Sequence, residues 1–163
     1  GFSRYLSGRN QVLLTLAAQI VADLDACGPD EAAARSEARA RASDRMWLWT
    51  LGAYEVVRTM CQAVRCFSPL FHGELSDLKA ELELVRVPNT KMERIKYDRK
   101  DRSVPVPSDR APEIWVDAHK DILVGDPADP MSARRLLATY ERVLASLAVE
   151  DVRMKHEDAY ERD

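Results

Sequence analysis

The chain has 163 residues, which fits a single domain long enough to bury about two thirds of the surface that its unfolded form exposes. Hydrophobic residues make up 46% and charged residues 31%, a balance that excludes both a disordered chain and a membrane-embedded one. The formal net charge of -3 excludes a global positive field, so binding to nucleic acid or anionic lipid would need a local basic patch.

The three cysteines, Cys27, Cys61 and Cys66, are an odd number in a chain large enough to build a full core. That number favours a reducing cytoplasm over a disulfide framework. Cys61 and Cys66 are five residues apart, on different faces of a helix, which favours two small core residues over a mutual disulfide or a shared metal. No segment reaches the roughly 20 apolar residues that span a bilayer. Because arginine outnumbers lysine and alanine is abundant, as in GC-rich bacterial genomes, we expect a bacterial, cytoplasmic protein without a membrane partner.

The first predicted helix runs from about residue 8 to residue 26 and ends before Gly28 and Pro29. Its apolar stripe contains Val12, Leu13, Leu16, Ile20 and Leu24. The second predicted helix follows Pro29 and meets no breaker until Pro69, so it would span about forty residues. Its first half is polar, and its glutamate to arginine pairs at i and i+4 favour a solvent-exposed arm.

The second half of this helix contains MWLWTLGAY, residues 46–54, which is apolar on every side of a helix. Trp47 and Trp49 are two positions and about 200° apart, so they point to nearly opposite faces. Such a segment must be covered on both sides, by its own neighbours or by a second subunit. We therefore expect an interface that contains Trp47, Trp49 and Tyr54.

The third predicted helix covers residues 70–87 and ends before Pro88. Six of the eight prolines lie in residues 88–130, which predicts turns and extended segments. Within them, residues 113–124 predict a small β-hairpin with its turn at residues 118–120. A last helix is expected at 131–149, and a charged, frayed tail at 150–163. The chain is thus predicted to be one all-α domain, a bundle of about four helices, one of them very long.

A narrow polar stripe follows the tryptophans. Glu55 and Arg58 are one turn apart among apolar neighbours, which predicts a partly buried ion pair that fixes helix packing. The same pair, together with Arg86, is also a candidate for a pocket that senses an anionic metabolite.

Two short blocks resemble a group of uncharacterised bacterial proteins: LGAYE-x-x-R at residues 51–58 and R-x-P-x-x-K-x-E at residues 86–93. The resemblance extends roughly from residue 44 to residue 145. It implies a fold but no established activity, so it carries no catalytic residue to this chain. It also implies one polar network, our candidate binding site, made of Tyr54, Glu55, Arg58, Arg86, Lys91 and Glu93.

Residues 91–102, KMERIKYDRKDR, hold six basic and three acidic residues around Tyr97. Basic side chains beside an aromatic ring suit single-stranded nucleic acid. The local excess of three positive charges is small, however, and a solvated turn or helix face explains it better.

Arg65 and His72 fit the Arg-x4-6-His pattern of HEPN ribonucleases, which are helical bundles with a dimeric active site. The resemblance implies that this arginine and histidine would act on the phosphate and 2′-hydroxyl of RNA. About one such match is expected by chance in this chain, and Cys66 and Pro69 both depart from the family pattern.

No other enzyme motif supports catalysis, and Cys61, Cys66 and His72 lack the fourth ligand of a familiar metal site, so we expect neither a metal nor a cofactor. The sequence favours a non-enzymatic bundle that associates with itself as a homodimer or with another protein. The alternative is a HEPN-like ribonuclease or RNA-binding bundle that uses Arg65 and His72.

Overall fold

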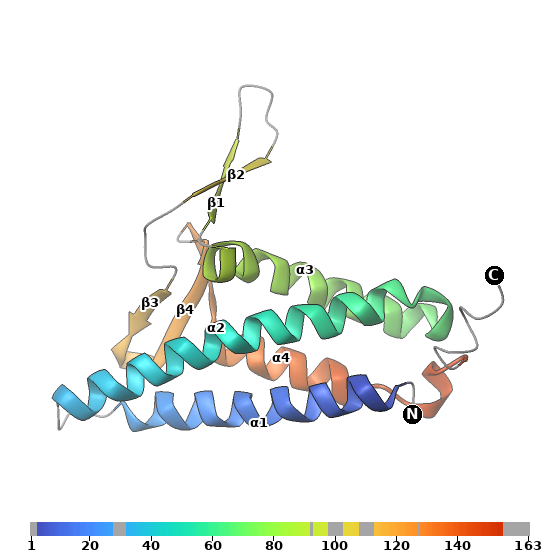
Figure 1. Ribbon diagram of the computed structural model, residues 1–163, viewed down its shortest axis with the longest axis horizontal. Helices are drawn as coiled ribbons and strands as arrows, with labels where there is room; N and C mark the ends of the chain where they lie inside the picture. Colours follow the sequence, from blue (N-terminus) through green and yellow to red (C-terminus); the bar gives the residue numbers. More distant parts are fainter. Residues whose placement is uncertain are drawn as a thin grey trace.

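The computed structural model describes residues 3–27, 32–91, 93–97, 103–107, 113–126 and 128–154. Its helices form a bundle in which α1 and α2 run antiparallel, α3 packs on α2, and α4 lies against α3 and α1 (Figure 1). The helices are α1 (Arg4–Ala26), α2 (Ala32–Gln62), α3 (Pro69–Lys91) and α4 (Ala133–Ala145). The predicted helical bundle is confirmed, but the all-α class is only roughly right, because two small antiparallel sheets precede the last helix.

The helices begin and end at residues other than those predicted, because side chains outside the apolar pattern of each helix determine its ends. α1 begins four residues early, since the hydroxyl of Ser3 accepts a hydrogen bond from the backbone N–H of Leu6 at 3.3 Å. α2 ends at Gln62, short of the predicted Pro69. The chain turns there through the 3-10 helix η1 (Val64–Cys66), which brings Cys66 and Phe67 into the core.

The prediction that α3 stops before Pro88 is wrong, because α3 continues to Lys91 with Pro88 inside it. Proline has no N–H, so the carbonyl of Leu84 one turn earlier receives no helical hydrogen bond from this position. Strand β4 (Asp121–Asp126) passes that carbonyl at Gly125, whose φ of 98° favours glycine. A Cβ at Gly125 would lie 3.6 Å from the Leu84 oxygen, an ordinary van der Waals distance, so the backbone conformation and not the spacing favours glycine here.

The proline-rich segment forms two small antiparallel sheets. The hairpin of β1 (Glu93–Tyr97) and β2 (Ser103–Pro107) projects from the end of α3, away from the bundle (Figure 1). The second sheet has the order β3 (Glu113–Val116), β4 (Asp121–Asp126) and β5 (Asp129–Ser132). The hairpin predicted at 113–124 is therefore confirmed, whereas β5 and the β1–β2 hairpin were not predicted.

The beginning of the charged tail is ordered against the core, which corrects the prediction of a frayed segment. Residues 149–151 form the 3-10 helix η3 (Val149–Asp151), and Val152 bridges to Phe67. Backbone hydrogen bonds of 2.8 and 2.9 Å join Ser68 to Asp151 and Arg153 to Cys66. The rest of the predicted tail, residues 155–163, lies outside the described residues. In the part of the chain that the structure describes, no helix is long and apolar enough to cross a membrane.

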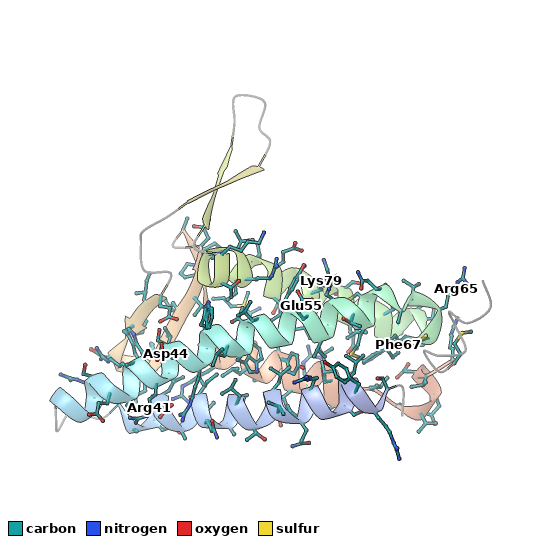
Figure 2. All side chains as sticks on the ribbon, viewed as in Figure 1. Arg41, Asp44, Glu55, Arg65, Phe67 and Lys79 are labelled. Carbon is teal, nitrogen blue, oxygen red and sulfur yellow. The ribbon has the colours of Figure 1, made fainter. Side chains whose placement is uncertain are left out.

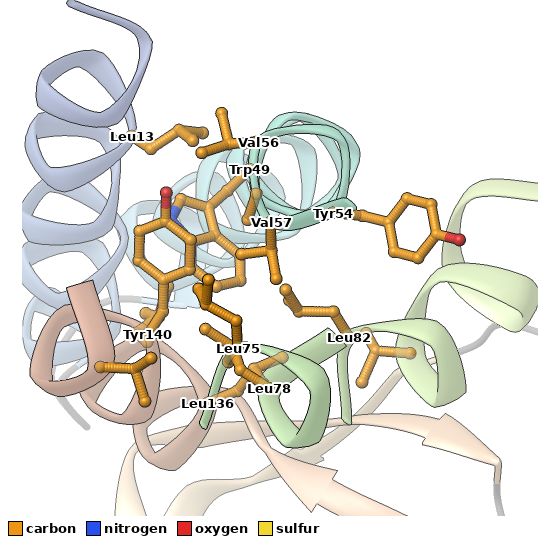
Figure 3. Packing of buried hydrophobic residues seen from close by; sticks show 14 of the residues in the cluster. Leu13, Trp49, Tyr54, Val56, Val57, Leu75, Leu78, Leu82, Leu136 and Tyr140 are labelled. Carbon is orange, nitrogen blue, oxygen red and sulfur yellow. The ribbon is translucent and has the colours of Figure 1, made fainter. Parts of the chain in front are cut away.

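The core is centred on Trp49, which is fully buried and meets the ring of Tyr140 edge to face, with 5.3 Å between centroids (Figure 3). Leucines from α3 and α4 complete this layer, and on the opposite side α1 approaches α2 closely at Gly52. A Cβ at Gly52 would lie only 2.8 Å from Cδ2 of Leu13, so glycine permits the close contact of α1 with α2. That close contact sets the floor of a surface groove.

Candidate functional site

An apolar groove of about 450 Å³ lies on the surface between α1 and α2. One wall comes from the N-terminal half of α1 and the other from the second half of α2. The lining residues are Tyr5, Leu6, Arg9, Val12, Leu13, Leu16, Leu48, Gly52, Glu55, Val56 and Thr59.

Several large apolar side chains in this groove are open to solvent. Val12 is 61% exposed, Leu48 51% and Tyr5 68%. On each helix the lining positions recur every three or four residues, so the apolar residues form a stripe along the groove. Val12 was predicted to face the core, and its exposure corrects that prediction. Apolar surface arranged in this way marks a site of association.

Two charged residues face each other across the groove. Arg9, on the α1 wall, donates a hydrogen bond from Nη2 to the hydroxyl of Tyr5 at 3.1 Å, and its guanidinium lies 5.0 Å from the centroid of the same ring. Glu55, on the α2 wall, accepts from Nε of Arg58 at 2.9 Å. The α1 wall is therefore positive and the α2 wall carries a carboxylate.

The structure corrects the predicted interface. Trp49 is fully buried and Tyr54 is 6% exposed, so both belong to the core of the chain itself. Trp47 is 40% exposed, but it is not among the residues that line the groove. The apolar stretch is thus covered on the Trp49 side by α3 and α4, and left open on the face of Trp47 and Leu48.

Among the described side chains, the predicted polar network forms two separate contacts. The Glu55–Arg58 ion pair forms, at 2.7 Å from Nη2, but its side chains are 49% and 41% exposed, so it is more open than predicted. Tyr54 instead meets α3, where the Arg86 guanidinium lies 4.4 Å from the ring centroid. Among the described residues, no hydrogen bond or ion pair joins the Glu55–Arg58 pair to the Tyr54–Arg86 contact.

The remaining members of that predicted site lie at the end of α3. Lys91 is its exposed last residue, and Glu93 begins β1. The basic segment 91–102 therefore straddles the end of the helix and the projecting hairpin, and is not a single turn or helix face. Residues 92 and 98–102 of this segment lie outside the described residues.

No hydrogen bond joins Arg65 to His72 in the part of the chain that the structure describes. Arg65 is exposed in η1, and its side chain points away from the bundle at the far end of α2 (Figure 2). The ring Nε2 of His72 lies 3.1 Å from the backbone carbonyl of Cys61. This carbonyl is among the last of α2, which has no helical partner for it, so the histidine acts as a cap. The geometry gives no support to the ribonuclease alternative.

The cysteines behave as core or near-core residues. Cys27, Cys61 and Cys66 are free thiols, and burial raises the pKa of both Cys61 and Cys66, which disfavours the reactive thiolate. Within the described ranges no three histidine, cysteine or carboxylate side chains gather as a metal site.

A group of polar contacts, which we call the latch, joins the sheet of β3, β4 and β5 to the first half of α2. The hydroxyl of Ser43 donates to Glu113 Oε2 at 2.6 Å, Arg39 pairs with Asp117, and the Arg39 guanidinium stacks 4.9 Å from the ring centroid of Trp115. Burial raises the pKa of Glu113, the Asp44 carboxylate raises it further, and the hydrogen bond from Ser43 opposes both. The latch thus positions β3.

Replacing Glu113 by glutamine is expected to stabilise the protein at neutral pH. Because the folded-state pKa lies above the unfolded one, the contribution of this group is complete below the unfolded-state pKa and is lost as pH rises through the folded value. We expect the melting temperature of Glu113→Gln to exceed that of the wild type by about 1 to 2 °C at pH 7, and the gain to vanish near pH 4. Glu141→Gln, on the exposed face of α4, is the control and is expected to show no such trend. A Glu113→Gln protein that is less stable at pH 7 would contradict this account.

Comparisons with protein-family models, with curated proteins and with solved structures find no match. The resemblance of the two sequence blocks to bacterial proteins therefore stays a prediction.

Proposed function

We propose that this protein is a non-enzymatic association module that forms a homodimer through the groove between α1 and α2. The observation that carries the proposal is the exposed apolar stripe of that groove, above all Val12 and Leu48. Contiguous apolar surface rimmed by charge is typical of protein interfaces.

The charges of the groove favour a second copy of the chain as the occupant. One wall carries Arg9 and the other Glu55, so the surface holds both halves of a charge pair. A surface of this kind complements itself, which is the requirement for a two-fold symmetric interface.

The test compares Leu48→Asp with Leu84→Asp by light scattering. Leu48 lies in the groove and Leu84 is 62% exposed on α3, so both changes add a charge to an exposed leucine. We expect a dimeric wild type, a monomeric Leu48→Asp protein, and a dimeric Leu84→Asp protein, with similar melting temperatures for both variants. A Leu48→Asp protein as dimeric as the wild type would overturn the proposal.

A further inference from the structure

We infer that the two-fold axis of this dimer runs parallel to the groove, so that Arg9 of each chain pairs with Glu55 of the partner subunit. The inference rests on the proposed homodimer and adds its geometry and its specificity-determining residues.

Arg9 and Glu55 lie at the same level of the groove. α1 and α2 are antiparallel, with Leu13 against Gly52 at one level and Asp23 bound to Arg41 and Arg45 at another. From the contact of Leu13 with Gly52, Arg9 is four residues toward the start of α1, about 6 Å away. Glu55 is three residues toward the end of α2, about 4.5 Å away in the same direction.

A two-fold axis parallel to the groove exchanges its two walls and preserves the level. α1 of one copy then lies over α2 of the other, antiparallel to it, as neighbouring helices do in up-and-down bundles. At the charged level, Arg9 meets Glu55 of the partner subunit. At the far end, Leu16 meets Leu48 of the partner subunit, so charge faces charge and apolar faces apolar.

A two-fold axis across the groove gives a poorer match. It places α1 over α1 and α2 over α2, so an axis at the charged level sets arginine against arginine and glutamate against glutamate. An axis at the level of Val12 instead sets Arg9 and Glu55 against the leucine end of the partner. The first arrangement costs like-charge repulsion, and the second buries charges without partners.

Both side chains have bonding capacity left for this pair. The two contacts from Arg58 to Glu55 both reach Oε2, and no contact given for the described residues involves Oε1. Arg9 uses one of its five guanidinium N–H groups on the hydroxyl of Tyr5. The groove therefore presents a carboxylate oxygen and several N–H donors toward whatever covers it.

The decisive experiment mixes two charge-reversal variants. In Arg9→Glu the homodimer would set glutamate against glutamate, and in Glu55→Arg it would set arginine against arginine. We expect each variant alone to dimerise with a dissociation constant at least about tenfold above that of the wild type, as measured by sedimentation. An equimolar mixture is expected to recover wild-type affinity, because both cross-chain pairs are then oppositely charged. Glu83→Arg, which breaks the Lys79–Glu83 pair outside the groove, is the matched control and is expected to dimerise normally.

The outcomes separate this inference from the proposed function. If the wild type dimerises and Leu48→Asp does not, but the single charge variants dimerise as well as the wild type, the axis is not parallel to the groove and the inference fails alone. Weakened single variants that are not rescued by mixing would contradict it in the same way. If the wild type itself is monomeric, the proposed homodimer fails first. Thermal unfolding of each variant confirms that a loss of dimer is not a loss of fold.

Discussion

Replacing Trp49 by alanine is expected to lower the free energy of unfolding by about 3 to 5 kcal/mol. The indole is fully buried at the centre of the bundle and packs edge to face on Tyr140 at 5.3 Å between centroids. Its removal leaves a cavity between α2 and α4 that neither helix can close without moving away from α3. Urea unfolding followed by circular dichroism measures the loss.

Trp47→Ala is the matched control because it removes the same side chain from the same helix at a site that is 40% exposed. We expect a cost of about 1 kcal/mol or less from Trp47→Ala. Both variants are best measured in the Leu48→Asp background, so that dissociation does not contribute. Equal losses for the two tryptophans would contradict the core described above.

Replacing Asp23 by alanine is expected to cost about 1 to 3 kcal/mol. Asp23 is 7% exposed and binds two cations of α2, Arg41 at 3.0 Å from Nε and Arg45. The loss is moderated because the arginines are 47% and 31% exposed, and water can solvate them once the carboxylate is gone. Glu37→Ala removes only the exposed partner of Arg41 at 3.7 Å, and we expect about 0.5 kcal/mol or less from it. An Asp23→Ala protein as stable as Glu37→Ala would contradict the role assigned to this cluster.

Helices and strands that bury one face were predicted well from the sequence. The last helix was expected at 131–149, and α4 lies inside that range and ends four residues early, with Leu136, Leu137, Tyr140 and Val143 buried on one face. The β3–β4 hairpin was predicted from two short β-prone runs around a polar turn, and Lys120 takes up the left-handed conformation in that turn. Periodicity and turn chemistry are local properties, so they can be read from the chain without knowing its neighbours.

Features that depend on a neighbouring element escaped prediction. The spacing of Val12 places it next to the core stripe of α1, but α2 covers only the adjacent Leu13. Likewise residues 46–54 are apolar on every side, so their sequence does not show which of Trp47 and Trp49 the rest of the chain covers. The turn of α3 that precedes Pro88 lies beside Gly125 of β4, and this contact cannot be predicted from either segment alone.

The candidate site was predicted only in part. Glu55 was selected from the sequence as a binding residue, and it does lie in the groove, but Arg9 and the exposed Leu48 were missed. A signal for them was present in the recurrence of residues 5, 9, 12 and 16 on one face of α1 and of 48, 52, 55 and 59 on one face of α2. What the sequence could not supply is that these two faces adjoin, because that follows from the close approach of Leu13 to Gly52.

The most direct test of the central claim is the molar mass of the wild-type protein by sedimentation equilibrium over a range of concentrations, beside Leu48→Asp. The groove-mediated homodimer predicts a mass of twice 18.4 kDa for the wild type and a single 18.4 kDa chain for the variant. A wild-type mass of one chain at every concentration would contradict it.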